Sequence, residues 1–368
     1  MSVLRRGPRR SGKIVFSDTS PYRSRRLDIE TDTVSTVAYL RDAGGSVIGA
    51  AWIANHESAP AGLDLARLDA GLAPALPAAL TSEPGGRSPL DPTALEVVWF
   101  EEGDGAAVLE GGEPLCVIPG WSDLGRGLPG YSRDALGQGP FALPFGNVEF
   151  GSPIEQAREY WARQRDAMVW GDFQQSALGH LLNRLGPGGQ YLHDVARGQA
   201  GGPLIAVSER PARESRPYTV LSTLGMSRQR MPAARPHEEN TTPYDRVELA
   251  LATTLPSGSA GQVLAWLAPH PWRSATRLVS GGVIPWTDRS AAFPLGERWA
   301  GAMLIDDPAE LTPEQPGPDL SGFQVGDDSV RWLWLVPITA DERALAAREG
   351  STTLLRHLTK AGRSWIAE

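Results

Sequence analysis

Two clusters of carboxylates are the leading candidates for a catalytic or metal-binding site in this chain. Their members are Asp28, Glu30 and Asp32 in the first cluster, and Glu101, Glu102 and Asp104 in the second. Either set offers oxygen ligands for a divalent cation or carboxyls for acid–base work. Neither has a His, Lys or Cys partner close in sequence. We therefore interpret the first as acids on an exposed strand, where they prevent unwanted edge pairing, and the second as residues of a hairpin turn.

Other catalytic or metal-binding patterns are weak in this chain. The six histidines are scattered, and no two have the i, i+4 spacing of a helical metal site. Residues 125–130 (GRGLPG) match G-x-G-x-x-G formally, but they do not directly follow a strand and Pro129 lies among them. Neither a G-x-S-x-G elbow nor a Walker phosphate loop is present. We predict no catalytic residue, no metal and no cofactor, and expect that the protein is not an enzyme.

Length and composition bound the class of protein. The chain has 368 residues, enough for two domains, and its single cysteine, Cys116, excludes an internal disulfide. We therefore predict a reducing, cytoplasmic location. No apolar run approaches the length of a membrane span, so no membrane partner is expected. The net charge is −8, yet residues 1–26 carry eight basic side chains against Asp18 alone. An acidic body disfavours nucleic acid, except through this basic tail.

Hydrophobic patterns predict an α+β (mixed α/β) protein. Strand and turn patterns alternate up to residue 118, and helical patterns begin near residue 152 and again at residue 173. Further strands and helices then alternate, which argues against a doubly wound fold. The predicted organisation is a basic, disordered tail over residues 1–30, a β-rich domain over 31–150, and a larger domain over 151–368.

The stretch YTVLSTLGMSRQRMP, residues 218–232, carries the most specific pattern. It begins as a strand, breaks at Gly225, and places Met226 and Met231 on either side of two arginines. This turn resembles the signature of the suppressor-of-fused (SUFU) family. Later stretches follow in the same order as in the family: DRVELALATTLP, GQVLAWLAPHP, LVSGGVIPW, WAGAMLID and VRWLWLVPITADE. The resemblance covers roughly residues 155–368, although Leu224 and Arg228 depart from the usual residues.

The resemblance implies a SUFU-like mixed sheet flanked by helices, with an appended N-terminal domain as in some bacterial relatives. It also implies a binding protein. Eukaryotic relatives hold an extended peptide of a transcription factor, and many bacterial relatives are thought to be immunity proteins that neutralise a toxin. The leading hypothesis is therefore an immunity-type protein that sequesters a protein partner. A regulatory or scaffolding module is the alternative, and an enzyme with a site at the domain junction is the third.

Five residues are candidate partner contacts, chosen for their chemistry and expected exposure. They are Arg228, Arg230, Glu248, Trp272 and Arg273. The two arginines of the turn are expected to point outward, and the Trp–Arg pair follows Pro–His–Pro in a loop-like context. Trp and Arg often dominate the energetics of interfaces. The predicted partner is a protein, either a toxin or an extended peptide segment.

Overall fold

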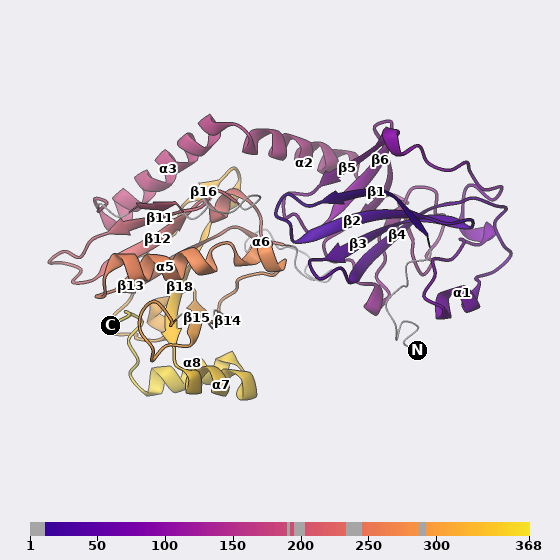
Figure 1. Cartoon of the computed structure of the whole chain (residues 1–368). Helices are drawn as coiled ribbons and strands as arrows, with labels where there is room; N and C mark the ends of the chain where they lie inside the picture. Colours follow the sequence, from indigo (N-terminus) through magenta and orange to yellow (C-terminus); the bar gives the residue numbers. More distant parts are fainter. Residues whose placement is uncertain (1–11, 190–191, 195–202, 233–244, 287–291) are drawn as a thin grey trace. The chain divides into compact units, whose positions relative to one another are not determined.

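The structure is a computed structural model that describes residues 12–189, 192–194, 203–232, 245–286 and 292–368 (Figure 1). The chain divides into two compact units. The first unit is Met1–Arg165 with Pro232–Pro236, and the second is Asp166–Met231 with His237–Glu368. The unit boundary thus lies at Arg165, whereas the sequence pattern placed a domain boundary near residue 150.

The first unit contains two β-sheets with a shared core. One sheet has the order β1 (Lys13–Thr19), β2 (Arg25–Thr31), β3 (Ser35–Asp42), β4 (Val47–Asn55), with every neighbouring pair antiparallel. The other has the order β5 (Leu95–Trp99), β6 (Ala106–Glu110), β7 (Glu113–Ile118), β8 (Tyr131–Ser132), β9 (Leu143–Pro144). Buried side chains of both sheets form one cluster, including Leu27, Leu40, Val108 and Ile118. The sheets therefore pack face to face.

The prediction that residues 1–30 form a disordered tail is not matched by residues 13–30. Lys13–Thr19 and Arg25–Thr31 are paired strands, and Leu27 and Ile29 of the second strand are buried. The basic residues at the start of β2, Arg25 and Arg26, obscured the alternating apolar residues Leu27 and Ile29. Residues 1–11 lie outside the described residues.

Short helical segments complete the first unit. They are α1 (Leu65–Asp69), three 3-10 turns at Ala78–Leu80, Pro92–Ala94 and Leu124–Arg126, and α2 (Gly151–Gln164). Helix α2 buries Ile154 and Ala157 against the β5–β9 sheet. Ser152 and Glu155 have the spacing of a capping box, but that box is not formed in this helix. Instead the carboxylate of Glu149 accepts a hydrogen bond from the Ser152 N–H at 3.1 Å.

A break separates α2 from the next helix, α3 (Ala167–Leu185). Asp166 is the N-cap of α3, and its carboxylate accepts a hydrogen bond from the Met168 N–H at 2.9 Å. Apolar residues recur at helical spacing from Ile154 to Met168, across this break. An aspartate cap stops that continuation because its side chain satisfies a free N–H at the start of a new helix.

The second unit is built on one mixed sheet of seven strands in the order β10-β11-β12-β13-β18-β15-β14. The strands are β10 (Leu192–Asp194), β11 (Ala206–Arg210), β12 (Thr219–Leu224), β13 (Val247–Thr253), β14 (Val283–Pro285), β15 (Gly301–Ile305) and β18 (Arg331–Ile338). Strands β13 and β18 pair in parallel, and the other neighbours are antiparallel. A separate hairpin joins β16 (Gln324–Val325) to β17 (Asp328–Ser329).

Helices cover both faces of this sheet (Figure 1). Buried residues of α3 and of α8 (Ser351–Lys360) share one cluster with Val220, Ala250 and Trp334 of the sheet. Helix α5 (Ser257–Leu267) contacts β11, β12 and β13 and lies outside that cluster, so it covers the opposite face. The short helix α6 (His270–Ser274) follows it, and α7 (Ala340–Glu349) precedes α8. The predicted α+β class, with a mixed sheet flanked by helices and a β-rich N-terminal part, is confirmed.

Within the described residues, none of the helices is both long enough and apolar enough to span a bilayer.

Candidate protein-binding surface

The turn after β12 is a compact, buried structure. Gly225 has a φ of 109°, and a 3-10 turn over Met226–Arg228 follows it. A Cβ on Gly225 would lie 2.3 Å from the carbonyl oxygen of Leu204 and 2.8 Å from the ring of Trp170. Both the backbone angle and the available space therefore require glycine here.

A single buried carboxylate holds this turn. Glu248 of β13 is 1% exposed, and its Oε1 accepts hydrogen bonds from the Gly225 N–H at 2.9 Å and the Ser227 N–H at 3.0 Å. The Ser227 hydroxyl donates to the same oxygen at 2.7 Å, and the Thr223 hydroxyl donates to Oε2 at 2.6 Å. Glu248 therefore fixes the turn from within, and its burial removes it from direct contact with a partner.

Burial sets the protonation behaviour of this carboxyl. Loss of solvent raises the pKa of Glu248, and the hydrogen bonds from Thr223, Ser227 and Gly225 oppose that rise without cancelling it. The charged form is thus disfavoured in the folded protein. The contribution of Glu248 to the stability of the fold is complete below the ordinary pKa of a glutamate. It is lost as the pH rises through the raised pKa of Glu248.

Gly225→Ala is expected to destabilise the second unit by about 2–4 kcal/mol, because it adds strain and a clash with the Leu204 carbonyl. Gly258→Ala is the matched control, since Gly258 lies in α5 and a Cβ there would meet nothing within 4 Å. The control should be neutral or slightly stabilising. Urea denaturation of both variants checks the difference. Equal stabilities would show that Gly225 is not constrained.

The other signature residues are also packed inward. Met226 is fully buried, and Met231 is 1% exposed, with its sulfur 3.4 Å from the Leu278 N–H. Arg228 is 6% exposed, and its guanidinium lies 5.3 Å from the ring centre of Trp170 in a cation–π contact. The expectation that Arg228 points outward is wrong, because the apolar stem and planar head are held against aromatic rings of α3.

Trp272 is likewise buried rather than exposed. It lies in α6, is fully buried, and its indole N–H donates to the carbonyl oxygen of Arg230 at 2.9 Å. The loop expected after residues 269–271 is in fact the first turn of a helix, which accommodates proline at its start. The indole therefore joins α6 to the signature turn and does not face solvent.

Two of the five candidates remain at the surface. Arg273 is exposed. Arg230 is half-buried, and its guanidinium donates to the Asp328 carboxylate at 2.9 Å. The indole of Trp272 donates to the backbone of Arg230, and Arg273 is the next residue after Trp272. The two arginines therefore lie on segments that contact each other. We call Arg230 and Arg273 the arginine edge. A role for it in partner binding stays a prediction.

Asp328 connects the arginine edge to the sheet. Its carboxylate also accepts a hydrogen bond from Arg246 at 2.8 Å, and Arg246 donates to the Ser227 carbonyl at 3.1 Å. Burial acts to raise the pKa of Asp328, but the hydrogen bonds and charges of Arg246 and Arg230 outweigh it and lower the pKa. The stabilisation from this carboxylate is present above its ordinary pKa and is lost as the pH falls through the lowered value.

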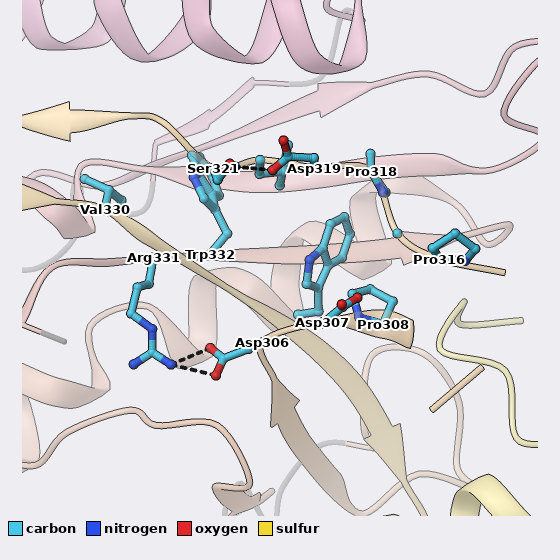
Figure 2. A pocket seen from close by; sticks show the side chains of 13 residues that line it. Asp306, Asp307, Pro308, Pro316, Pro318, Asp319, Ser321, Val330, Arg331 and Trp332 are labelled. Atoms are coloured by element: carbon cyan, nitrogen blue, oxygen red, sulfur yellow. Dashed lines mark hydrogen bonds and ion pairs between the residues drawn. The ribbon is translucent and has the colours of Figure 1, made fainter. Parts of the chain in front are cut away.

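A hollow of about 460 Å³ lies elsewhere in the second unit, between residues 306–321 and the start of β18 (Figure 2). Two of its acids are held by arginines. Asp306 accepts hydrogen bonds from Arg331 at 2.6 Å, and Asp319 accepts one from Arg184 at 3.0 Å. Asp319 also accepts from the Ser321 N–H at 2.8 Å. The walls include Pro308, Pro316 and Pro318, with Trp332 beside them.

Trp332 is one of the residues that line this hollow. The indole is 6% exposed and stacks on His180, with the ring centres 6.2 Å apart and the planes 9° from parallel. Its Nε1–H is buried and has no hydrogen-bond acceptor among the residues that the structure describes. A buried donor without a partner is costly. The sequence pattern did not indicate this hollow.

The first acidic cluster of the first unit is structural. Asp28 and Glu30 are buried, and Arg41 of β3 donates to both, at 2.7 and 2.6 Å. Their expected exposure on an edge strand is wrong, because β2 lies between β1 and β3 in the sheet. In the second cluster Asp104 is also buried, whereas Glu101 and Glu102 are half-buried.

The remaining weak patterns are placed as follows. Residues 125–130 form a loop, which overlaps only a short 3-10 turn at Leu124–Arg126. A further cluster of one histidine and two glutamates in the sequence, His237, Glu238 and Glu239, lies outside the described residues. Within the described part of the chain, no group of three or more His, Cys, Asp or Glu side chains is arranged to hold a metal ion.

Residues 202–368 match the family model described as Suppressor of fused protein (SUFU). The SUFU resemblance of the C-terminal part of the chain is therefore confirmed, although the match begins at residue 202 rather than near 155. Residues 1–165 of the first unit lie outside it and form the additional β-rich part. A comparison with curated proteins finds no match.

Solved structures of SUFU proteins align at low similarity. A SUFU homologue from Neisseria gonorrhoeae FA 1090 has 16% identity and a TM-score of 0.38, over 53% of this chain and 93% of that one. A Sufu–Fu complex has 14% identity and a TM-score of 0.36, over 53% and 90%. Drosophila Suppressor of Fused has 15% identity and a TM-score of 0.34, over 53% and 50%. These values are too low to transfer positions from one structure to another.

Proposed function

We propose that this chain is a protein-binding module that acts through its second unit. The SUFU family match over residues 202–368 is the observation that carries the proposal. One solved SUFU structure is a complex with a protein, Fu. By analogy, the second unit here would bind another polypeptide and would need no cofactor or metal for that role.

The local geometry supports binding rather than chemistry at the signature turn. The carboxylate of Glu248 is used in four hydrogen bonds within the fold. Its neighbours Met226 and Trp272 are fully buried. Among the described residues, the arginine edge provides accessible side chains beside the turn, and guanidinium groups are frequent anchors at protein interfaces. The hollow at Trp332 offers a second place for an extended segment.

The finer form of the proposal is an immunity-type protein in the bacterial cytoplasm. It would sequester a toxic protein partner by covering the surface that the toxin needs. The net charge of −8 favours association with a basic toxin through long-range steering. A regulatory or scaffolding role, with a transcription or signalling partner, is the alternative that the same family match supports.

Capture of a partner, followed by reconstitution, tests both forms. The purified full chain is used as bait in a lysate of the source organism at low and high salt. A partner that rebinds as a pure protein in fixed stoichiometry supports a binding module. If the partner stops growth when expressed alone and co-expression of this chain restores growth, the immunity form is supported. A non-toxic partner favours regulation, and failure of every candidate to rebind contradicts the proposal.

Charge reversal at the arginine edge is expected to weaken that complex. Arg273→Glu should raise the Kd about tenfold or more if the exposed guanidinium contacts the partner. Arg356→Glu, an equal charge change at an exposed position of α8, is the matched control and should change the Kd little. Titration calorimetry measures both. Equal effects would place the contact elsewhere, and Trp332→Phe, which removes only the indole N–H, then tests the hollow.

A further inference from the structure

The first unit contains a second hollow, of about 380 Å³, on the outer face of the β5–β9 sheet at the start of α2. Three aromatic rings form a continuous wall. The ring centres of Trp121 and Tyr131 are 6.0 Å apart, and those of Tyr131 and Phe150 are 5.1 Å apart. All three side chains are half-buried, and Val148 beside them is 47% exposed. The wall therefore presents apolar and aromatic surface to solvent.

Carboxylates share this hollow with the rings. Glu102, Asp104 and Glu149 line it, and none of its lining residues in the described part of the chain is Lys, Arg or His. Arg25 is the nearby cation whose charge interacts with Asp104. Glu149 is exposed and accepts from the Ser152 N–H, so it already caps the positive end of α2. Among the described residues, the charged side chains that line the hollow are therefore acidic.

The fold fixes one of these acids closely. Asp104 is 4% exposed, and a Cβ on Gly120 would lie 2.3 Å from its carboxylate. The backbone of residues 119–121 thus packs directly on the carboxylate, and Trp121 follows immediately. The glycine allows the charged group and the aromatic wall to lie side by side.

Aromatic faces together with carboxylates are suited to a cation. The negative face of an aromatic ring attracts a guanidinium or ammonium group, and carboxylates add charge attraction and hydrogen bonds. Guanidinium also stacks on rings and is weakly hydrated, so it enters such a site more readily than ammonium. We propose that this hollow, the aromatic–acidic pocket, binds an arginine side chain from a basic segment of a partner protein. This inference does not rest on the function proposed for the second unit.

A titration with matched peptides tests the pocket on the full chain. Three capped, fluorescently labelled peptides of equal length carry arginine, lysine or citrulline at one central position, in a glycine–serine background. Citrulline has nearly the shape of arginine but no charge. At low ionic strength the arginine peptide should bind more tightly than the lysine peptide, and both more tightly than the citrulline peptide. Equal binding of the arginine and citrulline peptides would overturn the proposal, as would no binding of any peptide.

Variants then place the bound peptide. Glu102→Gln with Glu149→Gln keeps an oxygen to cap α2, and should raise the Kd of the arginine peptide about tenfold. Trp121→Leu should raise it about fivefold. Glu57→Gln with Asp69→Asn removes the same charge at exposed positions outside the pocket, and should have little effect. Thermal melts confirm that each variant is folded. If the pocket variants and the control variant lose the same affinity for the arginine peptide, the peptide is held by general charge attraction and the proposed site is wrong.

Discussion

Glu248→Ala is expected to lower the free energy of unfolding of the second unit by about 3–5 kcal/mol, because it leaves buried donors without an acceptor. The Gly225 and Ser227 N–H groups both donate to this carboxylate, and the turn around them is closed to water. Hydrogen exchange over residues 219–232, together with urea denaturation, measures the loss. Glu314→Ala, at an exposed position, is the control and should change stability by less than about 0.5 kcal/mol.

The amide variant separates hydrogen bonding from charge. Glu248→Gln keeps an oxygen for the two N–H groups and resembles the protonated acid. Because burial raises the pKa of Glu248, the wild-type protein should lose stability as the pH rises from about the ordinary glutamate pKa through the raised value. The Gln variant lacks this decline, so its stability relative to wild type should improve toward neutral pH. Parallel pH curves for the two proteins would contradict a raised pKa.

Arg41→Met is expected to cost the first unit about 3–5 kcal/mol, because it leaves two buried carboxylates without their shared cation. The guanidinium donates to Asp28 at 2.7 Å and to Glu30 at 2.6 Å, and all three side chains are at most 7% exposed. Calorimetry of the full chain can follow the transition of the first unit. Arg126→Met, at an arginine that is 72% exposed, is the control and should have little effect.

The cost of Arg41→Met should depend on pH with a definite sign. Burial acts to raise the pKa of Asp28, but hydrogen bonds from Ser17, Arg26 and Arg41 outweigh it and lower the pKa. This carboxylate therefore stabilises the wild type above its ordinary pKa, and the contribution is lost as the pH falls through the lowered value. The gap between wild type and variant should narrow in acid. A gap that stays constant would indicate lost packing rather than unpaired charge.

Much of the fold is predictable from sequence because local signals agree with it. The alternation of residues 218–224 gives β12, and the break at Gly225 gives the turn. Arg273 was expected to be exposed, and it is exposed in the structure. These features depend on a residue and its near neighbours, where propensity and turn chemistry act directly.

The parts that were mispredicted depend on distant residues. Glu248 is buried because donors more than twenty positions earlier surround it, and Trp272 because its indole reaches Arg230. Asp28 and Glu30 are buried because Arg41 comes from the neighbouring strand. A charged or amphipathic side chain is predicted from sequence to be exposed when its partner in the fold is not known. The aromatic–acidic pocket was missed for the same reason, since residues 100–104, 117–121 and 148–153 meet only in the fold.

The parallel pairing of β13 with β18 has a consequence for synthesis on the ribosome. Val247 lies opposite Arg331, and Ala367 also joins this region by donating its N–H to the Ala252 carbonyl. The centre of the second sheet therefore stays incomplete until residues 331–367 have left the exit tunnel. The strands of the first unit all come from residues 13–144 and have no such requirement. Until then a nascent chain would expose the unpaired edge of β13, a surface prone to aggregation.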